Sequence, residues 1–285
     1  MTNRQLLYFV LMWLFSLALW WHPLAKTVRL ALDNSAYTHI LLILPLACAL
    51  IYQDRAVLTR TLQPNRALGG LFLVVALLLA SLAKWGMAST PGDIRLSMSM
   101  LGLVIAWAGI FISCFGTRSF RGLLFPICFL FLLVPLPDST VAKVVDLLQQ
   151  QSADAARIMF QVAHVPVRQA GVILSIPDLD IAVAQECSSI RSSFVLIITT
   201  MFLAQVILRS WWRRLLLIFL SVPLSVVKNG LRIFTIAELG TRVDPWFIDG
   251  PFHHHGGVIF LGIALAVIAV LIWVLRRSET VASHA

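Results

Sequence analysis

Long apolar runs recur along the whole chain, and short stretches with charged residues separate them. A helix needs about 20 predominantly apolar residues to cross a bilayer, so each run of roughly this length predicts a membrane span. The sequence therefore predicts an all-α fold, a polytopic transmembrane bundle of about eight helices. We expect these helices at residues 5–21, 38–53, 67–84, 97–116, 120–136, 188–208, 213–230 and 256–275.

The long stretch at residues 137–187 interrupts this pattern before the sixth helix. In "VAKVVDLLQQQSADAARIMFQVAHV" the apolar residues recur at helical spacing between charged and amide residues, which is typical of an amphipathic helix at the membrane interface. The following "VRQAGVILSIPDLDIAVAQE" is rich in β-branched residues and predicts a short hairpin that turns at "PDLD". Ordered connections of this length are usually functional, so we expect a cap over the bundle that forms a substrate groove, rather than a plain loop.

The composition agrees with a membrane protein. Hydrophobic residues make up 59% of the chain and charged residues 12%, whereas soluble domains are typically about 45–50% apolar and about 25% charged. The sequence has no low-complexity tract and no obvious internal repeat. We therefore expect one integral membrane domain over residues 1–285, with residues 137–187 as its periplasmic region.

The distribution of Lys and Arg predicts the orientation of the chain. With the N-terminus in the cytoplasm, eleven arginines lie at cytoplasmic helix ends, packed into short loops such as "RSWWRR", and the other eleven cations lie outside, several of them in the long loop. Cations in short loops set the orientation, so we expect both termini inside. The net charge of +9 then reflects orientation and attraction to anionic lipids, and no nucleic-acid partner is expected.

The first candidate for chemistry is a cysteine at the outer membrane boundary. Three of the four cysteines lie inside apolar runs, where cysteine acts as a small hydrophobe. Cys187 instead follows Glu186 and precedes Arg191 by four residues. Residues i and i+4 share a helix face, so we expect Arg191 inside the bundle, one turn below the thiol. A nearby cation and a helix start both favour the thiolate, which is the nucleophilic form.

A second polar cluster follows the apolar run of the seventh helix in "VVKNGLRIFTIAELG", with Lys228, Asn229 and Arg232. Ionisable residues near membrane spans mark functional sites by default, although long cations also snorkel to the interface. Both interpretations stay open for Lys228. Arg232 is followed by more apolar sequence, which favours a function for it.

The third cluster, "PFHHHGGVIF", opens the last helix with His253, His254 and His255. Imidazole is the usual general acid and base near neutral pH, and the two following glycines allow a peptide to approach closely. Three adjacent histidines point in different directions, so at most two face one site. They are poorly spaced for a tetrahedral metal site, and the chain has no HExxH or CxxC pattern, so we predict neither a metal nor a cofactor.

The predicted topology brings these clusters to one side of the membrane. The sixth helix runs inward from Cys187, the seventh runs outward to Arg232, and the eighth runs inward from His253. A thiol, a guanidinium and an imidazole are the groups that cysteine-based acyl transfer needs as nucleophile, oxyanion stabiliser and acid/base. Residues 188–275 are therefore predicted to be a catalytic three-helix part.

The motifs "AQECSSIRSS", "NGLRI" and "FHHHGG", in this order on successive helices, resemble the exosortase/archaeosortase family of membrane transpeptidases. The upstream "FLFLLVPLPDS" is similar as well, and the resemblance covers most of the chain. It implies that Cys187 is the catalytic cysteine and that Arg232, next to Asn229, is the catalytic arginine. It also implies a catalytic histidine within 253–255, where His253 best keeps the family's spacing to the glycines.

The resemblance also implies a reaction and its partners. Substrates are proteins with a C-terminal sorting signal of the PEP-CTERM type, in which a short motif such as Pro-Glu-Pro precedes one transmembrane helix and basic residues. Cleavage on the periplasmic side of the bacterial inner membrane forms a thioester acyl-enzyme, and the new C-terminus passes to an acceptor such as a polysaccharide or a lipid-linked group. Membrane lipids are the other expected partners. The family commonly has glycine where this chain has Ser189, and we expect a local backbone adjustment there.

Several roles stay open in this interpretation. Glu186, His254 and His255 are expected to support the catalytic groups. The acidic residue of the sorting motif has four candidate partners, which are Arg168, Arg191, Lys228 and Arg232. A membrane transporter, or a structural component of polysaccharide export, is the alternative function. The chain shows no paired repeat, and its polar clusters gather at one face rather than at the midplane, which argues against a transporter.

Overall fold

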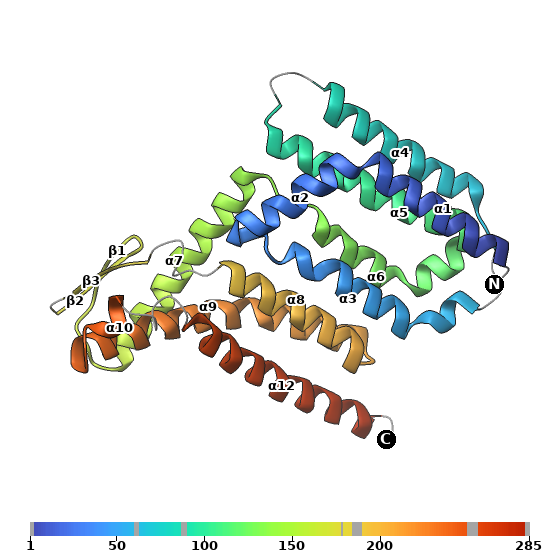
Figure 1. The fold of residues 1–285 in the computed structure, drawn as a ribbon. Helices are drawn as coiled ribbons and strands as arrows, with labels where there is room; N and C mark the ends of the chain where they lie inside the picture. The colour runs from blue at the N-terminus through green and yellow to red at the C-terminus, as the bar shows by residue number, and fades with distance from the viewer. Residues whose placement is uncertain are drawn as a thin grey trace. The chain divides into compact units, whose positions relative to one another are not determined.

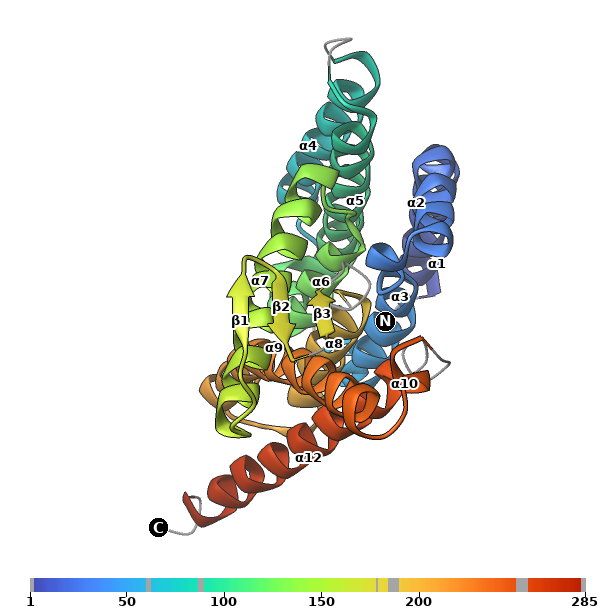
Figure 2. The same ribbon diagram turned by 90° about the vertical axis from the view of Figure 1, so that its left-hand side faces the viewer.

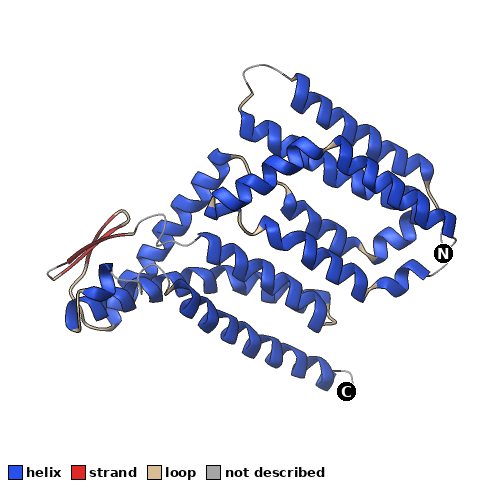
Figure 3. Cartoon of the chain, viewed as in Figure 1, coloured by secondary structure: helices blue, strands red, loops and turns tan. Residues whose placement is uncertain are grey.

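The computed structural model of the chain describes residues 3–59, 63–86, 90–177, 179–183, 190–249 and 256–282, which are predominantly helical (Figures 1 and 3). They divide into two compact units, Met1–Val141 and Ala142–Ala285. Within the described residues, six helices are long and apolar enough to cross a membrane, and the number rises to eight if each of two bent helix pairs is one span. The predicted all-α polytopic bundle is confirmed.

The first unit is built around one long helix, α5 (Gly92–Gly122), whose most apolar stretch is largely buried. It runs alongside α4 (Arg66–Trp85), and a Cβ on Gly102 or Gly109 of α5 would lie 2.9 Å from a carbonyl oxygen of α4. Small residues at such contacts let membrane helices approach closely. The unit also contains α1 (Asn3–Leu19), α2 (Trp21–Asp33), η1 (Ser35–Tyr37), α3 (Ile40–Gln53), η2 (Arg55–Thr59), α6 (Leu124–Phe129) and η3 (Leu130–Leu133).

α5 bends at Gly116, the residue where the predicted helix 97–116 ends. Gly116 has a φ of +83°, in the left-handed region that favours glycine. The carbonyl of Gln63 also occupies the space that a Cβ on Gly116 would need. The helix then continues to Gly122, so part of the next predicted span belongs to α5.

The structure of the first unit differs from the prediction at two places. Residues 120–136 do not form one helix, because α6 and η3 are short and lead into the next helix at a bend of 97°. Pro135 and Pro137 explain this break, since proline lacks a backbone N–H and disfavours helix in the preceding residue. The helix α2 was not predicted. It follows α1 at a bend of 71°, and its buried residues are only Thr27 and Ala31.

The second unit begins within α7 (Asp138–Val162) and continues with a three-stranded antiparallel sheet in the order β1-β2-β3 (Figure 2). The strands are β1 (Arg168–Ala170), β2 (Ile173–Ile176) and β3 (Leu179–Ala182). Ile176 pairs with Leu179, which confirms the hairpin predicted at 177–180. α7 confirms the predicted amphipathic helix, and its place at the membrane interface stays a prediction. The later helices are α8 (Ile190–Ile207), α9 (Trp211–Arg242), α10 (Trp246–Asp249) and α12 (Gly257–Ala282).

Two apolar cores lie along α9. The first joins α7, the sheet and the later part of α9, and consists of Ala153, Ala156, Phe160, Leu174, Ile176, Val183, Ile233 and Ala237. The second joins α8, α12 and the earlier part of α9, and consists of Leu196, Ala204, Leu208, Leu217, Ala264, Ile268 and Ile272. The predicted helix 213–230 is therefore too short, because polar residues end its apolar run but the helix continues to Arg242.

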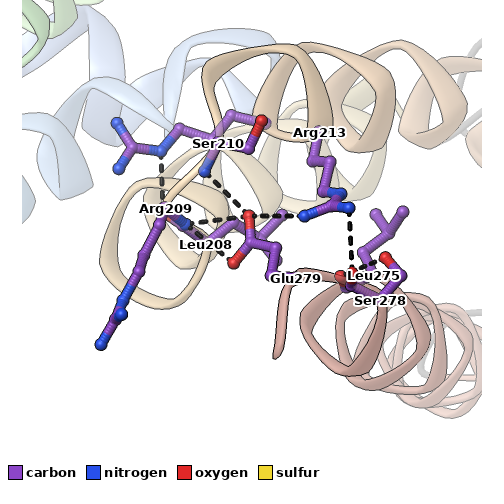
Figure 4. Close-up of polar contacts among 8 residues, drawn as sticks. Leu208, Arg209, Ser210, Arg213, Leu275, Ser278 and Glu279 are labelled. Atoms are coloured by element: carbon purple, nitrogen blue, oxygen red, sulfur yellow. Dashed lines mark hydrogen bonds and ion pairs between the residues drawn. The ribbon is translucent and has the colours of Figure 1, made fainter. Parts of the chain in front are cut away.

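One carboxylate joins the connection between α8 and α9 to the last turns of α12 (Figure 4). Glu279 accepts hydrogen bonds from the backbone N–H of Ser210 at 2.8 Å and of Arg209 at 3.2 Å. It also forms an ion pair with Arg213 at 3.5 Å, and Arg213 donates to the carbonyl of Ser278. These contacts hold α8, α9 and α12 together at one end of the helix trio.

The contact between α9 and α7 predicts a selective effect of added volume. A Cβ on Gly230 would lie 2.7 Å from the Ala155 Cβ and 3.0 Å from the Ala156 backbone nitrogen, whereas a Cβ on Gly262 of α12 meets nothing within 4 Å. We expect Gly230→Ala to destabilise the protein by about 1–3 kcal/mol through overpacking. The matched change Gly262→Ala should be neutral or stabilising, since alanine favours helix. Thermal unfolding in detergent measures both, and equal midpoints would contradict this packing.

Candidate functional site

The polar residues in the middle of α9 are buried. Lys228 is 4% exposed, Asn229 0% and Arg232 6%. Lys228 and Arg232 are four residues apart, so they lie on the same face of the helix. Asparagine, lysine and arginine at such positions need polar partners, because an uncompensated buried charge is costly.

The first turn of α8 supplies partners to this face. The Lys228 ammonium donates a hydrogen bond to the Ser192 hydroxyl, and the Asn229 amide donates to the Ser193 hydroxyl at 3.5 Å. α8 begins at Ile190, so both serines lie in its first turn. The start of α8 is thereby bonded to the middle of α9.

The start of α12 contacts the same stretch of α9. Gly257 is the first residue of α12, and a Cβ on it would lie 3.8 Å from the Arg232 Nη1 and 4.0 Å from its Cζ. Because Gly257 has no side chain, none lies between the start of α12 and the guanidinium. α8 and α12 thus both begin beside the buried cations of α9.

These starts give the site a positive electrostatic character. A helix N-terminus carries roughly half a positive charge, and two such ends lie next to Lys228 and Arg232. Among the described residues, Ser192 is the hydrogen-bond partner of the Lys228 ammonium, and no carboxylate forms an ion pair with it. The arrangement favours an anion, whether a thiolate, an oxyanion or a carboxylate.

α7 and the sheet support the site from another side. Gly230, between the buried polar residues of α9, packs on Ala155 of α7. Six residues earlier on α7, the buried Gln149 donates from its amide nitrogen to the carbonyl oxygen of Val183 at 3.0 Å. Sequence reasoning missed Gln149, which stands in a run of three glutamines. Its spacing of four residues from Val145 on the buried face was the available signal.

The structure brings together only part of the predicted site. Lys228, Asn229 and Arg232 lie together as described above. Arg191 is exposed, so the expectation that it lies inside the bundle is wrong. Ile190 and Ser193 occupy the buried face of α8 about 60° apart, whereas Arg191 lies about 100° from Ile190 on the side away from Ser193 and points away from that face.

The other predicted site residues lie outside the described residues, namely Glu186, Cys187, His253, His254 and His255. In the chain, Cys187 precedes the start of α8 by three residues, and His255 precedes the start of α12 by two. Across the part of the chain that the structure describes, no three His, Cys, Asp or Glu side chains are grouped to hold a metal ion.

One comparison with known proteins identifies a relationship. The family model described as Transmembrane exosortase matches residues 20–270, which is most of the chain and includes α7, α8, α9 and the first part of α12. No curated protein matches the chain. No solved structure matches it either.

The bond between α9 and α8 predicts a coupling that stability measurements can detect. Ser192→Ala removes the hydroxyl that accepts from the buried Lys228 ammonium, and hydrogen bonds to charged groups contribute about 1.5–3 kcal/mol. We expect the cost to fall sharply when Ser192→Ala is made in a Lys228→Met background, where no ammonium needs an acceptor. A double-mutant cycle by thermal unfolding in detergent measures the coupling. The same cost in both backgrounds would refute the contact.

Proposed function

The chain belongs to the transmembrane exosortase family, and from this we propose that it is a cysteine peptidase and transpeptidase of the bacterial inner membrane. The observation that supports this most directly is the electropositive junction of α8, α9 and α12 at Lys228 and Arg232. Acyl transfer by a thiolate produces negative charge at each step, and a water-poor positive site stabilises that charge strongly.

In the proposed reaction, the Cys187 thiolate attacks the carbonyl carbon of the scissile peptide bond. Negative charge develops on the carbonyl oxygen, and the guanidinium of Arg232 stabilises it. Collapse of this intermediate breaks the C–N bond, forms the thioester, and sends a proton from the imidazolium of His253 to the leaving amine. His254 and His255 are alternatives for that role. An acceptor nucleophile, or water, then attacks the thioester after losing its proton to the same imidazole, and the thiolate is released.

The proposed substrates are proteins with a C-terminal sorting signal of the PEP-CTERM type. Their transmembrane helix would lie against the bundle and present the motif at the periplasmic boundary. A polysaccharide or lipid-linked group would serve as acceptor. The excess of arginine in the short loops supports cytoplasmic termini and a periplasmic site.

Burial ranks the four candidate partners for the acidic residue of the motif. Arg168 and Arg191 are exposed, whereas Lys228 and Arg232 are buried. Arg232 is assigned to the oxyanion in the proposed mechanism. We therefore assign Lys228 to the substrate carboxylate, because a desolvated cation discriminates charged from neutral partners more strongly than a solvated one.

The central prediction concerns the nucleophile. Cys187→Ala should leave a folded, membrane-inserted protein that does not process a co-expressed substrate, since alanine cannot form the thioester. Mass spectrometry of the substrate's new C-terminus would identify the cleavage site and the acceptor together. Cys128→Ala serves as the matched control and should process normally. Normal processing by the Cys187→Ala variant would rule out the proposed mechanism.

Removing the charge from Lys228, or from the substrate motif, tests the role of Lys228. Lys228→Met should slow processing of a substrate with glutamate in its motif by about 10- to 100-fold, the range typical for losing one well-placed interaction. The wild-type enzyme should suffer a similar loss with a glutamine motif, and the variant should distinguish the two substrates poorly. Arg168→Met is the control at an exposed cation. If the variant keeps the full preference for glutamate, Lys228 does not bind that carboxylate.

A further inference from the structure

Gln149 occupies an unusual position on α7. The buried face of this helix otherwise presents small or apolar residues and one serine, namely Val145, Ser152, Ala153, Ala156 and Phe160. Gln149 is 8% exposed on that face. Its amide nitrogen donates to the carbonyl oxygen of Val183 at 3.0 Å. A polar side chain on such a face is stable because this bond satisfies it.

The acceptor of this bond is the carbonyl oxygen of Val183, which lies at the end of the sheet. Val183 follows β3 directly and is 1% exposed. Its backbone N–H donates to the carbonyl of Val172 at 2.9 Å, while its own carbonyl accepts from Gln149. Both backbone polar groups of Val183 are therefore bonded. In the chain, Val183 precedes Cys187 by four residues.

The same helix fixes the stretch of α9 that contains Arg232. Ala155 and Ala156 of α7 pack against Gly230, two residues before Arg232. Gln149 and Ala155 are six residues apart on one helix, which corresponds to about 9 Å along its axis. α7 thus contacts both the chain that leads to Cys187 and the turn that leads to Arg232.

We propose that Gln149 is a positioning residue, which bonds Val183, four residues before Cys187 in the chain, to the helix that packs against α9 just before Arg232. The inference rests on the proposed function, because it concerns the alignment of the proposed nucleophile with its oxyanion stabiliser. Without the amide, the Val183 carbonyl loses its donor and this anchor is released. A displacement of about 1 Å at a reacting group lowers the rate by about 100-fold.

The test uses the full-length protein in detergent with a sorting-signal peptide substrate. Gln149→Met keeps the length of the side chain and removes the donor. It should lower kcat by about 10- to 100-fold with little change in KM, at temperatures well below its unfolding midpoint. Gln150→Met, at an exposed position next to it, is the matched control and should behave as wild type. A wild-type kcat for Gln149→Met, or an equal loss for both variants, would overturn the inference.

A second variant, Gln149→Glu, distinguishes the positioning role from a general loss of packing. Gln149→Glu can donate to the Val183 carbonyl only when its carboxyl group is protonated. Its activity relative to wild type should therefore rise as the pH falls, which a general loss of packing would not produce. A constant ratio across the pH range would count against positioning.

A third readout separates this inference from the proposed function. Alkylation of Cys187 by a maleimide, quantified by peptide mass spectrometry with Cys48 as internal reference, does not require turnover. We expect Gln149→Met to change the rate at Cys187 several-fold while Cys48 is unaffected. If the wild type processes no substrate but this change occurs, the proposed function fails, whereas the influence of the Gln149 bond on the surroundings of Cys187 stands. An unchanged alkylation rate overturns the positioning role.

Discussion

The second unit depends on the burial of two cations in the middle of one helix. Lys228 and Arg232 lie on one face of α9, between an apolar core shared with α7 and the sheet and another shared with α8 and α12. Desolvating a cation costs several kcal/mol even after relaxation. For Lys228, the Ser192 hydroxyl in the first turn of α8 offsets part of this cost. The starts of α8 and α12 add further positive potential, so the site is poised for an anion.

The surrounding packing keeps this costly arrangement in place. Gly230 brings α9 against α7 at a distance that leaves no room for a Cβ unless the helices shift. At the other end of the helices, Glu279 bonds the α8–α9 connection and pairs with Arg213, which ties α12 to both. The trio is thus held at both ends, by the cations at one and by the carboxylate at the other. An electrostatic site is effective only when its dipoles and charges cannot relax, and these contacts limit such relaxation.

The sequence predicted the elements that have a clear hydropathy pattern or a regular spacing of apolar residues. Long apolar runs predicted most spans, and helical spacing predicted α7, because both patterns report directly on which face avoids water. α2 was missed because Lys26, Arg29 and Asp33 interrupt its apolar residues, so it does not form an apolar run of spanning length. The end of α9 was misplaced because Lys228 and Arg232 lower local hydropathy, although tertiary contacts bury them. Arg191 was misplaced because spacing fixes which residues share a face, but not which face the neighbouring helices cover.

The burial of the side chain decides between the two interpretations of Lys228, namely a cation that snorkels to the interface and a cation with a function. A snorkelling lysine buries its aliphatic stem and keeps its ammonium in water. Lys228 is instead 4% exposed and donates to Ser192 inside the helix trio. A buried cation has lost its hydration energy, and it destabilises the fold unless an anion or polar groups compensate that loss. In the proposed reaction that anion is the carboxylate of the bound motif, while the neighbouring Arg232 stabilises the oxyanion that forms when the thiolate attacks. The positive site would then contribute to substrate binding through Lys228 and to catalysis through Arg232.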